Sequence, residues 1–130
     1  MKKKAIPPTD KLRRYTSWVQ AIYTFLTAVW PIVDIKSFMM VSGYKTDRWL
    51  VETVSVLLLS LSICILLDIF SKGDHFSVPV LALLMSVSLA YIDFYYALHG
   101  TISKIYMADG LAEIVFAGCW TVFLVKKQAP

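Results

Sequence analysis

The chain has 130 residues, of which 58% are hydrophobic and only 17% are charged, and its formal net charge is +4. Four apolar segments, each near the length of about 20 residues that a bilayer-crossing helix needs, take up almost the whole sequence, so we expect no soluble domain within it. The basic residues flank these segments, the two cysteines stand alone, and no metal-ligand or phosphate-loop motif is present, so we expect an integral membrane protein without a nucleic-acid partner, metal or cofactor.

The N-terminal part of the chain predicts a basic tail, one span and a short connecting element. Residues 1–14 are polar and basic and should form a cytoplasmic tail, in which the Pro7-Pro8 pair predicts an extended or disordered segment at residues 5–10. The first span is expected at residues 18–33, where Pro31 should kink or end the helix. Residues 35–42 are apolar but too short to cross a bilayer. They predict a short interfacial helix or a re-entrant turn, and a simple loop is the alternative.

Three longer apolar runs follow, and they predict spans at residues 49–70, 78–96 and 105–125. The core of the second span reads VSVLLLSLSICILL, and Pro79 falls in the first turn of the third span, where proline is tolerated. Short polar turns separate the runs, and residues 128–130 form a C-terminal tail. The predicted fold class is an all-α polytopic membrane protein in which residues 15–127 form a four-helix, up-down transmembrane bundle.

The distribution of basic residues predicts the orientation of the chain in the cell (inner) membrane. With the N-terminus in the cytoplasm, nine lysines and arginines lie inside and four lie outside, the latter being Lys36, Lys45, Arg48 and Lys104. Positive residues are retained on the cytoplasmic side of membrane proteins. We therefore expect both termini to be cytoplasmic.

In this orientation, acidic residues gather towards the outer side of the spans. Each span brings at least one acid to this level, and the set is Asp34, Glu52, Asp93, Asp109 and Glu113. Acidic groups within the hydrocarbon region are costly and are candidates for function. Two aromatic residues of similar depth, Trp30 and Tyr91, and the turn residue His99 are further candidates for the lining of an acidic pocket.

Helical periodicity places these acids on faces that carry small and hydroxyl residues. On the third span, residues at spacings of three and four are Pro79, Ala82, Ser86, Ala90 and Asp93. The corresponding faces of the second and fourth spans are Glu52, Ser55, Leu59, Ser62, Leu66 and Asp109, Ala112, Glu113, Phe116, Ala117. Such residues are typical of packed membrane helix faces, so the acids are expected to point into the bundle.

A purely structural interpretation of the charges stands beside this one. Glu52 can pair with Arg48 four residues earlier on the helix surface. Asp109 can stabilise the start of its helix through the helix dipole. Asp34 can be a solvated interfacial residue and His99 an ordinary loop residue. On either interpretation, Asp93 and Glu113 remain the strongest candidates.

Two fragments carry a resemblance to a known group of proteins. The stretch Tyr44-Lys-Thr-Asp-Arg-Trp-Leu-Val51, and Ile92-Asp-Phe-Tyr-Tyr followed by Ile102-Ser-Lys-Ile-Tyr-Met-Ala-Asp and Glu113, resemble small four-helix bacterial membrane proteins of unassigned function. The architecture is also similar, more remotely, to DoxX-like and sterol-isomerase-like proteins, which pair an interior acid cluster with aromatic residues. The resemblance implies a four-helix fold and a bacterial membrane, and it transfers no site residue.

Three functions fit the sequence. The first is a non-enzymatic membrane protein with an outward-facing acidic pocket that binds a small cationic or amphipathic ligand, or an accessory subunit of a larger membrane complex. The second is a homo-oligomeric transporter or channel for protons or cations, although such sites usually lie nearer the midplane of the membrane. The third is an enzyme acting on a lipid or isoprenoid, which is less favoured because no nucleophile or metal set is visible. Apart from the lipid bilayer, these functions imply a small ligand or further copies of the chain as partners.

Overall fold

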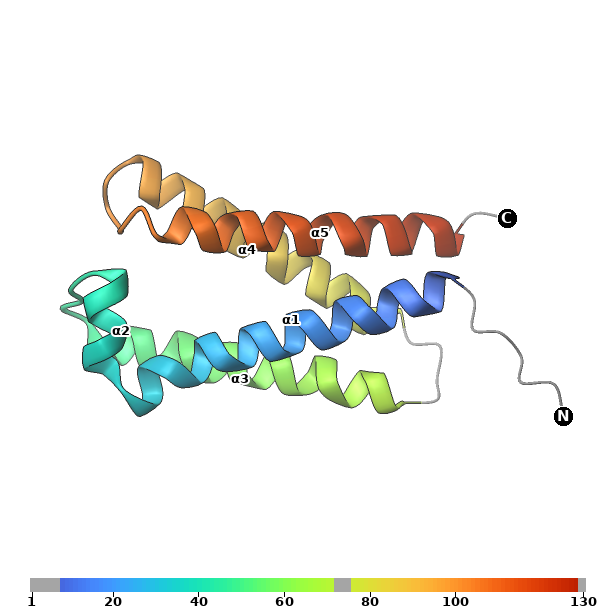
Figure 1. The fold of residues 1–130 in the computed structure, drawn as a ribbon, viewed down its shortest axis with the longest axis horizontal. Helices are drawn as coiled ribbons and strands as arrows, with labels where there is room; N and C mark the ends of the chain where they lie inside the picture. Colours follow the sequence, from blue (N-terminus) through green and yellow to red (C-terminus); the bar gives the residue numbers. More distant parts are fainter. Residues whose placement is uncertain (1–7, 72–75, 129–130) are drawn as a thin grey trace, which may run out of the picture.

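The computed structural model describes residues 8–71 and 76–128, and within these residues all regular secondary structure is helical. The elements are α1 (Pro8–Val33), α2 (Ile35–Ser42), α3 (Arg48–Phe70), α4 (Ser77–Leu98) and α5 (Tyr106–Gln128). Successive long helices run in opposite directions, so α2 and the turn between α4 and α5 lie at one end of the molecule (Figure 1). We call this the α2 end. The predicted all-helical, up-down arrangement is thus present.

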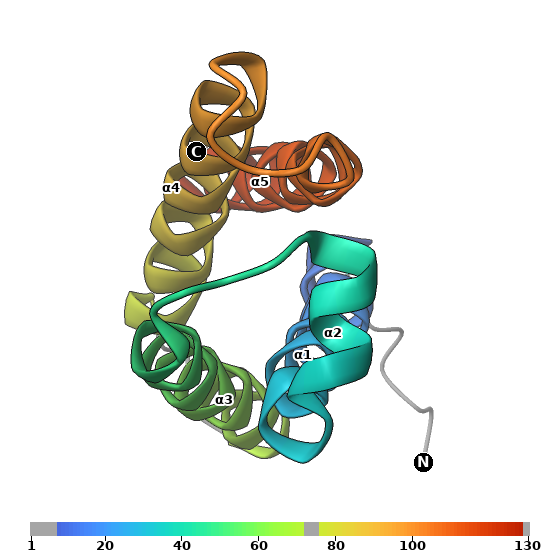
Figure 2. The ribbon, with the colours of Figure 1, turned by 90° about the vertical axis from the view of Figure 1, so that its left-hand side faces the viewer.

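The four long helices form two hairpin-like pairs. Helix α1 packs along α3, and α4 packs along α5 (Figure 2). The two pairs meet mainly where α1 contacts α5, whereas α3 and α4 touch only slightly although they are consecutive. The contacts between α1 and α5 therefore determine how the two halves of the molecule fit together.

Helix α1 begins earlier than the sequence pattern indicated. It already includes Pro8, so the prediction that residues 8–10 are extended is wrong, while residues 1–7 lie outside the described part of the chain. Proline is tolerated in the first turn of a helix because the first N–H groups have no intrahelical acceptor. Pro31 lies two residues before the end of α1, as expected of a residue that ends the helix.

The segment after the first span is a helix and not a simple loop. Helix α2 is turned by 114° from α1 at a break after Val33. The Asp34 carboxylate accepts a hydrogen bond of 3.2 Å from the backbone N–H of Ser37, the usual arrangement for a residue that caps a helix start. At the other end, Gly43 has φ +93°, a conformation that glycine adopts without strain.

Helices α3, α4 and α5 are long and apolar enough to cross a membrane, and α1 with α2 forms a fourth candidate if the bent pair is taken as one span. The bounds of α3, α4 and α5 lie within three residues of the predicted spans. The predicted polar turn between the second and third spans falls on residues 72–75, which lie outside the described residues.

Burial on α4 follows the predicted face, since Pro79, Ala82, Ser86, Ala90 and Asp93 are all buried. These small residues let neighbouring helices approach closely. The hydrophobic core next to this face is formed by a cluster from α1, α3, α4 and α5: Ala21, Ile65, Ala82, Met85, Trp120 and Phe123. The core fixes α4 and α5 against each other and so positions the polar residues nearer the α2 end.

Candidate functional site

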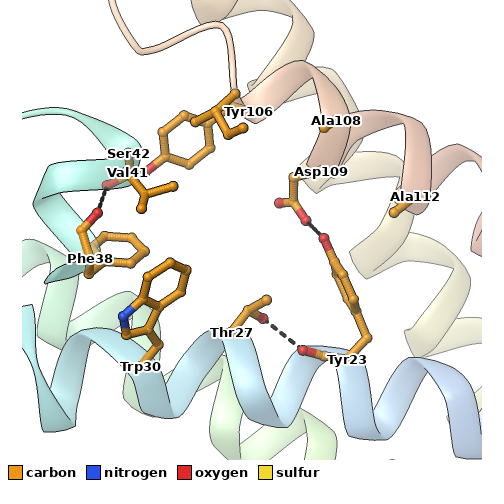
Figure 3. A pocket seen from close by; sticks show the side chains of 11 residues that line it. Tyr23, Thr27, Trp30, Phe38, Val41, Ser42, Tyr106, Ala108, Asp109 and Ala112 are labelled. Atoms are coloured by element: carbon orange, nitrogen blue, oxygen red, sulfur yellow. Dashed lines mark hydrogen bonds between the residues drawn. The ribbon is translucent and has the colours of Figure 1, made fainter.

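A cavity of about 400 Å³ lies between α1, α2 and α5 near the α2 end (Figure 3). Residues of three elements line it: Tyr23, Thr27 and Trp30 from α1, Phe38, Val41 and Ser42 from α2, and Ile105, Tyr106, Ala108, Asp109 and Ala112 from the start of α5 and the residue before it. The sharp bend before α2 creates this space, because it swings α2 across the end of the bundle towards α5. The volume is in the range of small-molecule sites.

Aromatic side chains form much of the cavity wall. The Trp30 and Phe38 rings meet edge to face with their centroids 5.6 Å apart. The Trp30 indole N–H donates a hydrogen bond of 2.8 Å to the Ser37 hydroxyl, which fixes the orientation of the indole. Tyr106 faces them from α5 (Figure 3). Rings of this kind attract cations at their faces.

Among the described residues that line the cavity, Asp109 is the only acidic one. It sits in the first turn of α5, where the helix dipole stabilises a negative charge. The Tyr23 hydroxyl donates a hydrogen bond to the Asp109 carboxylate, which joins α1 to α5 (Figure 3). The Tyr23 ring also contacts Phe116 of α5 at a centroid distance of 5.7 Å. Asp109 is therefore held in a fixed position on the cavity wall.

Two further acids lie next to Asp109 inside the bundle. Asp93 of α4 is 5% exposed and lies beside Asp109. Glu113 lies one turn after Asp109 on α5 and is 2% exposed. Oδ2 of Asp93 and Oε2 of Glu113 are buried without a hydrogen-bond partner. We call Asp93, Asp109 and Glu113 the acid cluster.

Gly110 allows α4 and α5 to come together at the level of the acid cluster. A Cβ atom on Gly110 would lie 2.8 Å from Cε2 of Phe94 and 3.3 Å from Cβ of Asp93. Only a residue without a side chain leaves room for α4 at this distance. The carboxyl groups of Asp93 and Asp109 can meet because of this close approach.

Next to the acid cluster, a chain of hydrogen bonds joins Ser86, Gln20 and Trp120. The Gln20 amide donates to the Ser86 hydroxyl at 2.8 Å, and the Trp120 indole N–H donates to the Gln20 amide oxygen at 2.6 Å. Gln20 and Trp120 are fully buried, and Ser86 is as well. This buried polar network links α1, α4 and α5.

The structure brings some of the predicted site residues together and separates others. The predicted acids Asp93, Asp109 and Glu113 lie together, and Trp30 lines the adjoining cavity. These acids were predicted to point into the bundle, and for Asp93 and Glu113 burial confirms this. Asp109 is half-buried at the cavity wall.

Glu52 does not face into the bundle, and that prediction is wrong. Its side chain is 52% exposed and pairs with Arg48 at 3.5 Å along the helix surface, as the structural interpretation had it. Burial on α3 begins only at Ser55, so Glu52 lies beyond the packed part of the helix.

Asp34, Tyr91 and His99 also lie apart from the acid cluster. Asp34 is exposed at the start of α2, where the hydrogen bonds from Ser37 hold the pKa of its carboxyl below its usual range. Tyr91 is 64% exposed and stacks on Tyr95, and the exposed His99 stacks on the same Tyr95 ring at a centroid distance of 4.3 Å. The wider ring of acids expected from both hairpins is thus reduced to the acids of α4 and α5.

Tyr23 and Gln20 were not predicted as site residues from the sequence. Both lie on α1, the least apolar of the long helices, and a signal was present there. Polar residues recur at helical spacing along α1, and those that are buried are Thr16, Ser17, Gln20 and Thr24. A buried polar stripe of this kind in a membrane helix indicates hydrogen bonding to a neighbouring helix.

At the opposite end of the molecule, an ion pair connects α1 to α3. Arg13 and Asp68 approach to 2.5 Å, and the Asp68 side chain is 2% exposed.

Within residues 8–71 and 76–128, no group of three or more His, Cys, Asp or Glu side chains is arranged to hold a metal ion. The acid cluster therefore lacks the convergent geometry of a metal site.

Comparisons with protein-family models, with curated proteins and with solved structures each found no match to this chain.

Proposed function

We propose that the chain is a four-span protein of the cell membrane, with α1 as the fourth span and α2 lying at the outer surface. The N-terminal and C-terminal segments are then cytoplasmic, because nine of the 13 basic residues fall on the side of the chain ends. In this orientation the α2 end faces outwards, and so does the cavity between α1, α2 and α5.

The function that this arrangement supports best is the binding of a small amphipathic organic cation in the cavity. The observation that carries the proposal is the placement of one carboxylate, Asp109, on the wall of a cavity of about 400 Å³ that is otherwise largely aromatic and aliphatic. The carboxylate supplies the charge, Trp30 and Phe38 supply faces for a cation, and Tyr106 adds apolar area for its hydrocarbon part.

The interaction free energies favour a cationic ligand over a neutral one. An ion pair at about 4 Å is worth about 4 kcal/mol at an effective dielectric constant near 20, which is typical of partly buried sites. A cation at an aromatic face adds about 0.5–2 kcal/mol. A neutral ligand of the same shape gains neither contribution.

Isothermal titration of the purified protein in detergent micelles with benzyltrimethylammonium tests this proposal. This probe combines a permanent positive charge with an aromatic group. We expect Asp109→Asn to weaken its binding at least tenfold, which is about 1.4 kcal/mol, because the charge is removed while the shape is kept.

Glu52→Gln is the matched control, because it removes a carboxylate at the same end of the molecule but outside the cavity. Its affinity for the probe should equal that of the unmodified protein. Equal weakening by the two variants would mean that only general surface charge attracts the cation. If Asp109→Asn binds the probe as tightly as the unmodified protein, Asp109 is not part of the binding site.

A further inference from the structure

We propose that the cavity exchanges a proton for its cation: a cation that binds beside Asp109 displaces a proton that Asp109 shares with Asp93. This inference rests on the proposed function and adds a protonation step to it. It makes ligand binding in the cavity dependent on the proton concentration on the outer side of the membrane.

The first observation is the closeness of two carboxyl groups. Asp93 lies against the first turn of α5, where its Cβ is 3.3 Å from the position of a Cβ atom on Gly110, the residue that follows Asp109. Two carboxylates that share a buried site repel each other, so ionisation of both is costly. In this arrangement, the pair therefore holds one proton, and the proton belongs to the pair and not to either residue alone.

The second observation is independent of this contact. Oδ2 of Asp93 and Oε2 of Glu113 have no hydrogen-bond partner, although the two residues are only 5% and 2% exposed. Buried oxygens of acidic groups are costly when nothing compensates them. These two oxygens of the acid cluster thus lack a positive charge or a hydrogen-bond donor. The cluster lies directly behind the cavity wall.

The groups that surround the pair do not supply a positive charge. From α1, the Tyr23 hydroxyl donates to Asp109, and from α5 Glu113 contributes a further acid. The cavity-lining residues of α2, which are Phe38, Val41 and Ser42, carry no charge.

Among the described residues, the basic side chains of the α2 end form no ion pair with the acid cluster. The Lys45 ammonium donates to the Ser42 carbonyl at 3.0 Å and lies 5.0 Å from the centre of the Tyr106 ring. Arg48 pairs with Glu52, and Lys36 and Lys104 are exposed. Protons and an incoming cation are therefore the available sources of positive charge for the acid cluster.

The exchange leaves the charge of the site unchanged. Before binding, the pair carries one proton and one negative charge in total. When the cation enters, the O–H bond of the pair breaks, the proton passes to water, and both carboxylates become ionised. The positive charge of the ligand then replaces that of the proton, and Tyr23 continues to donate to Asp109.

The test measures protons released when the full-length protein in detergent micelles binds benzyltrimethylammonium. Titrations are run at one pH in two buffers that differ in ionisation enthalpy, and the dissociation constant is also followed across pH. The charge of this probe does not change with pH, so any dependence belongs to the protein. We expect release approaching one proton per bound cation, and binding that tightens with rising pH by up to about tenfold per pH unit.

Two variants show which carboxyl group releases the proton. Asp93→Asn keeps a donor to Asp109 through its amide but has no proton to lose, so it should bind the probe without proton release and with little pH dependence. Glu113→Gln should still release the proton. If Glu113→Gln abolishes the release while Asp93→Asn keeps it, the pair is wrongly assigned and the proposal fails.

The result on the unmodified protein does not depend on either variant folding. Probe binding without proton release in both buffers, and with an affinity that does not change with pH, would overturn the exchange and leave the proposed function standing. Absence of probe binding at every pH would overturn the proposed function and the exchange with it. A protonated carboxylic acid band in the infrared spectrum that disappears when the probe binds would support the exchange.

Discussion

At the scale of single residues, the molecule depends on polar side chains that are buried between helices. Gln20 accepts from the Trp120 indole and donates to Ser86, so one side chain connects three helices. Inside a membrane protein, the alternative to such a bond is an unsatisfied polar group in an apolar environment. Because α1 and α5 provide the main contact between the two halves, this residue also helps to hold the halves together.

Replacing Gln20 by leucine should therefore destabilise the protein. The change keeps a similar volume but removes two hydrogen bonds and leaves the indole N–H without an acceptor. Hydrogen bonds between membrane helices are worth about 0.6 kcal/mol on average and up to about 1.7 kcal/mol, so we expect a loss of about 1–2 kcal/mol in unfolding experiments in mixed micelles. Gln128→Leu is the control, since Gln128 is exposed at the end of α5. Equal stability of the two variants would show that the network contributes nothing.

At the scale of elements, the contact between α4 and α5 is built around Gly110. The ring of Phe94 and Cβ of Asp93 occupy the space where a side chain on Gly110 would lie. At Gly118, two turns later on the same helix, a Cβ atom would meet no atom of a neighbouring element within 4 Å. The two glycines thus offer a matched comparison between a packed and an open site on one helix.

Alanine at these two positions should have opposite effects. Gly→Ala within a helix gains up to about 1 kcal/mol from propensity, and Gly118→Ala should show this gain. Gly110→Ala should lose about 1–3 kcal/mol through overpacking, and it should also weaken cation binding by pushing Asp93 away from Asp109. Thermal unfolding of both variants measures the change in stability. If Gly110→Ala is as stable as Gly118→Ala, the close approach of the helices is not required.

At the scale of the whole molecule, periodicity and composition were enough to predict the helices and one of the packed faces. The small residues of α4 recur at helical spacing, and all five residues of the predicted face are buried. Pro31 and the apolar segment at residues 35–42 predicted a short helix as one alternative, beside a re-entrant turn and a simple loop. Asp93 and Glu113 were found because acids are rare in apolar helices.

Periodicity and composition did not predict which helices pack against each other. Glu52 shares a face with the buried Ser55, but its exposure depends on where the packing of α3 against α1 begins. The hydrogen bonds of Tyr23 and Gln20 depend on α1 lying against α5, which no spacing in the sequence indicates. The cavity itself depends on the 114° turn between α1 and α2.

The most direct test of an outward-facing, cation-binding cavity is the reaction of single cysteines in intact cells. Cys64 and Cys119 are replaced by alanine, and Val41→Cys then places a thiol on the cavity wall. The reagent is the impermeant cation [2-(trimethylammonium)ethyl] methanethiosulfonate. Thr46→Cys, exposed between α2 and α3, and Gln128→Cys at the far end serve as controls.

We predict that Val41→Cys reacts from outside and that benzyltrimethylammonium slows the reaction. Thr46→Cys should react at a rate that this cation does not change, and Gln128→Cys should not react. Labelling of Gln128→Cys but not of Val41→Cys would contradict the orientation, and labelling of Val41→Cys that the cation leaves unchanged would contradict binding in the cavity.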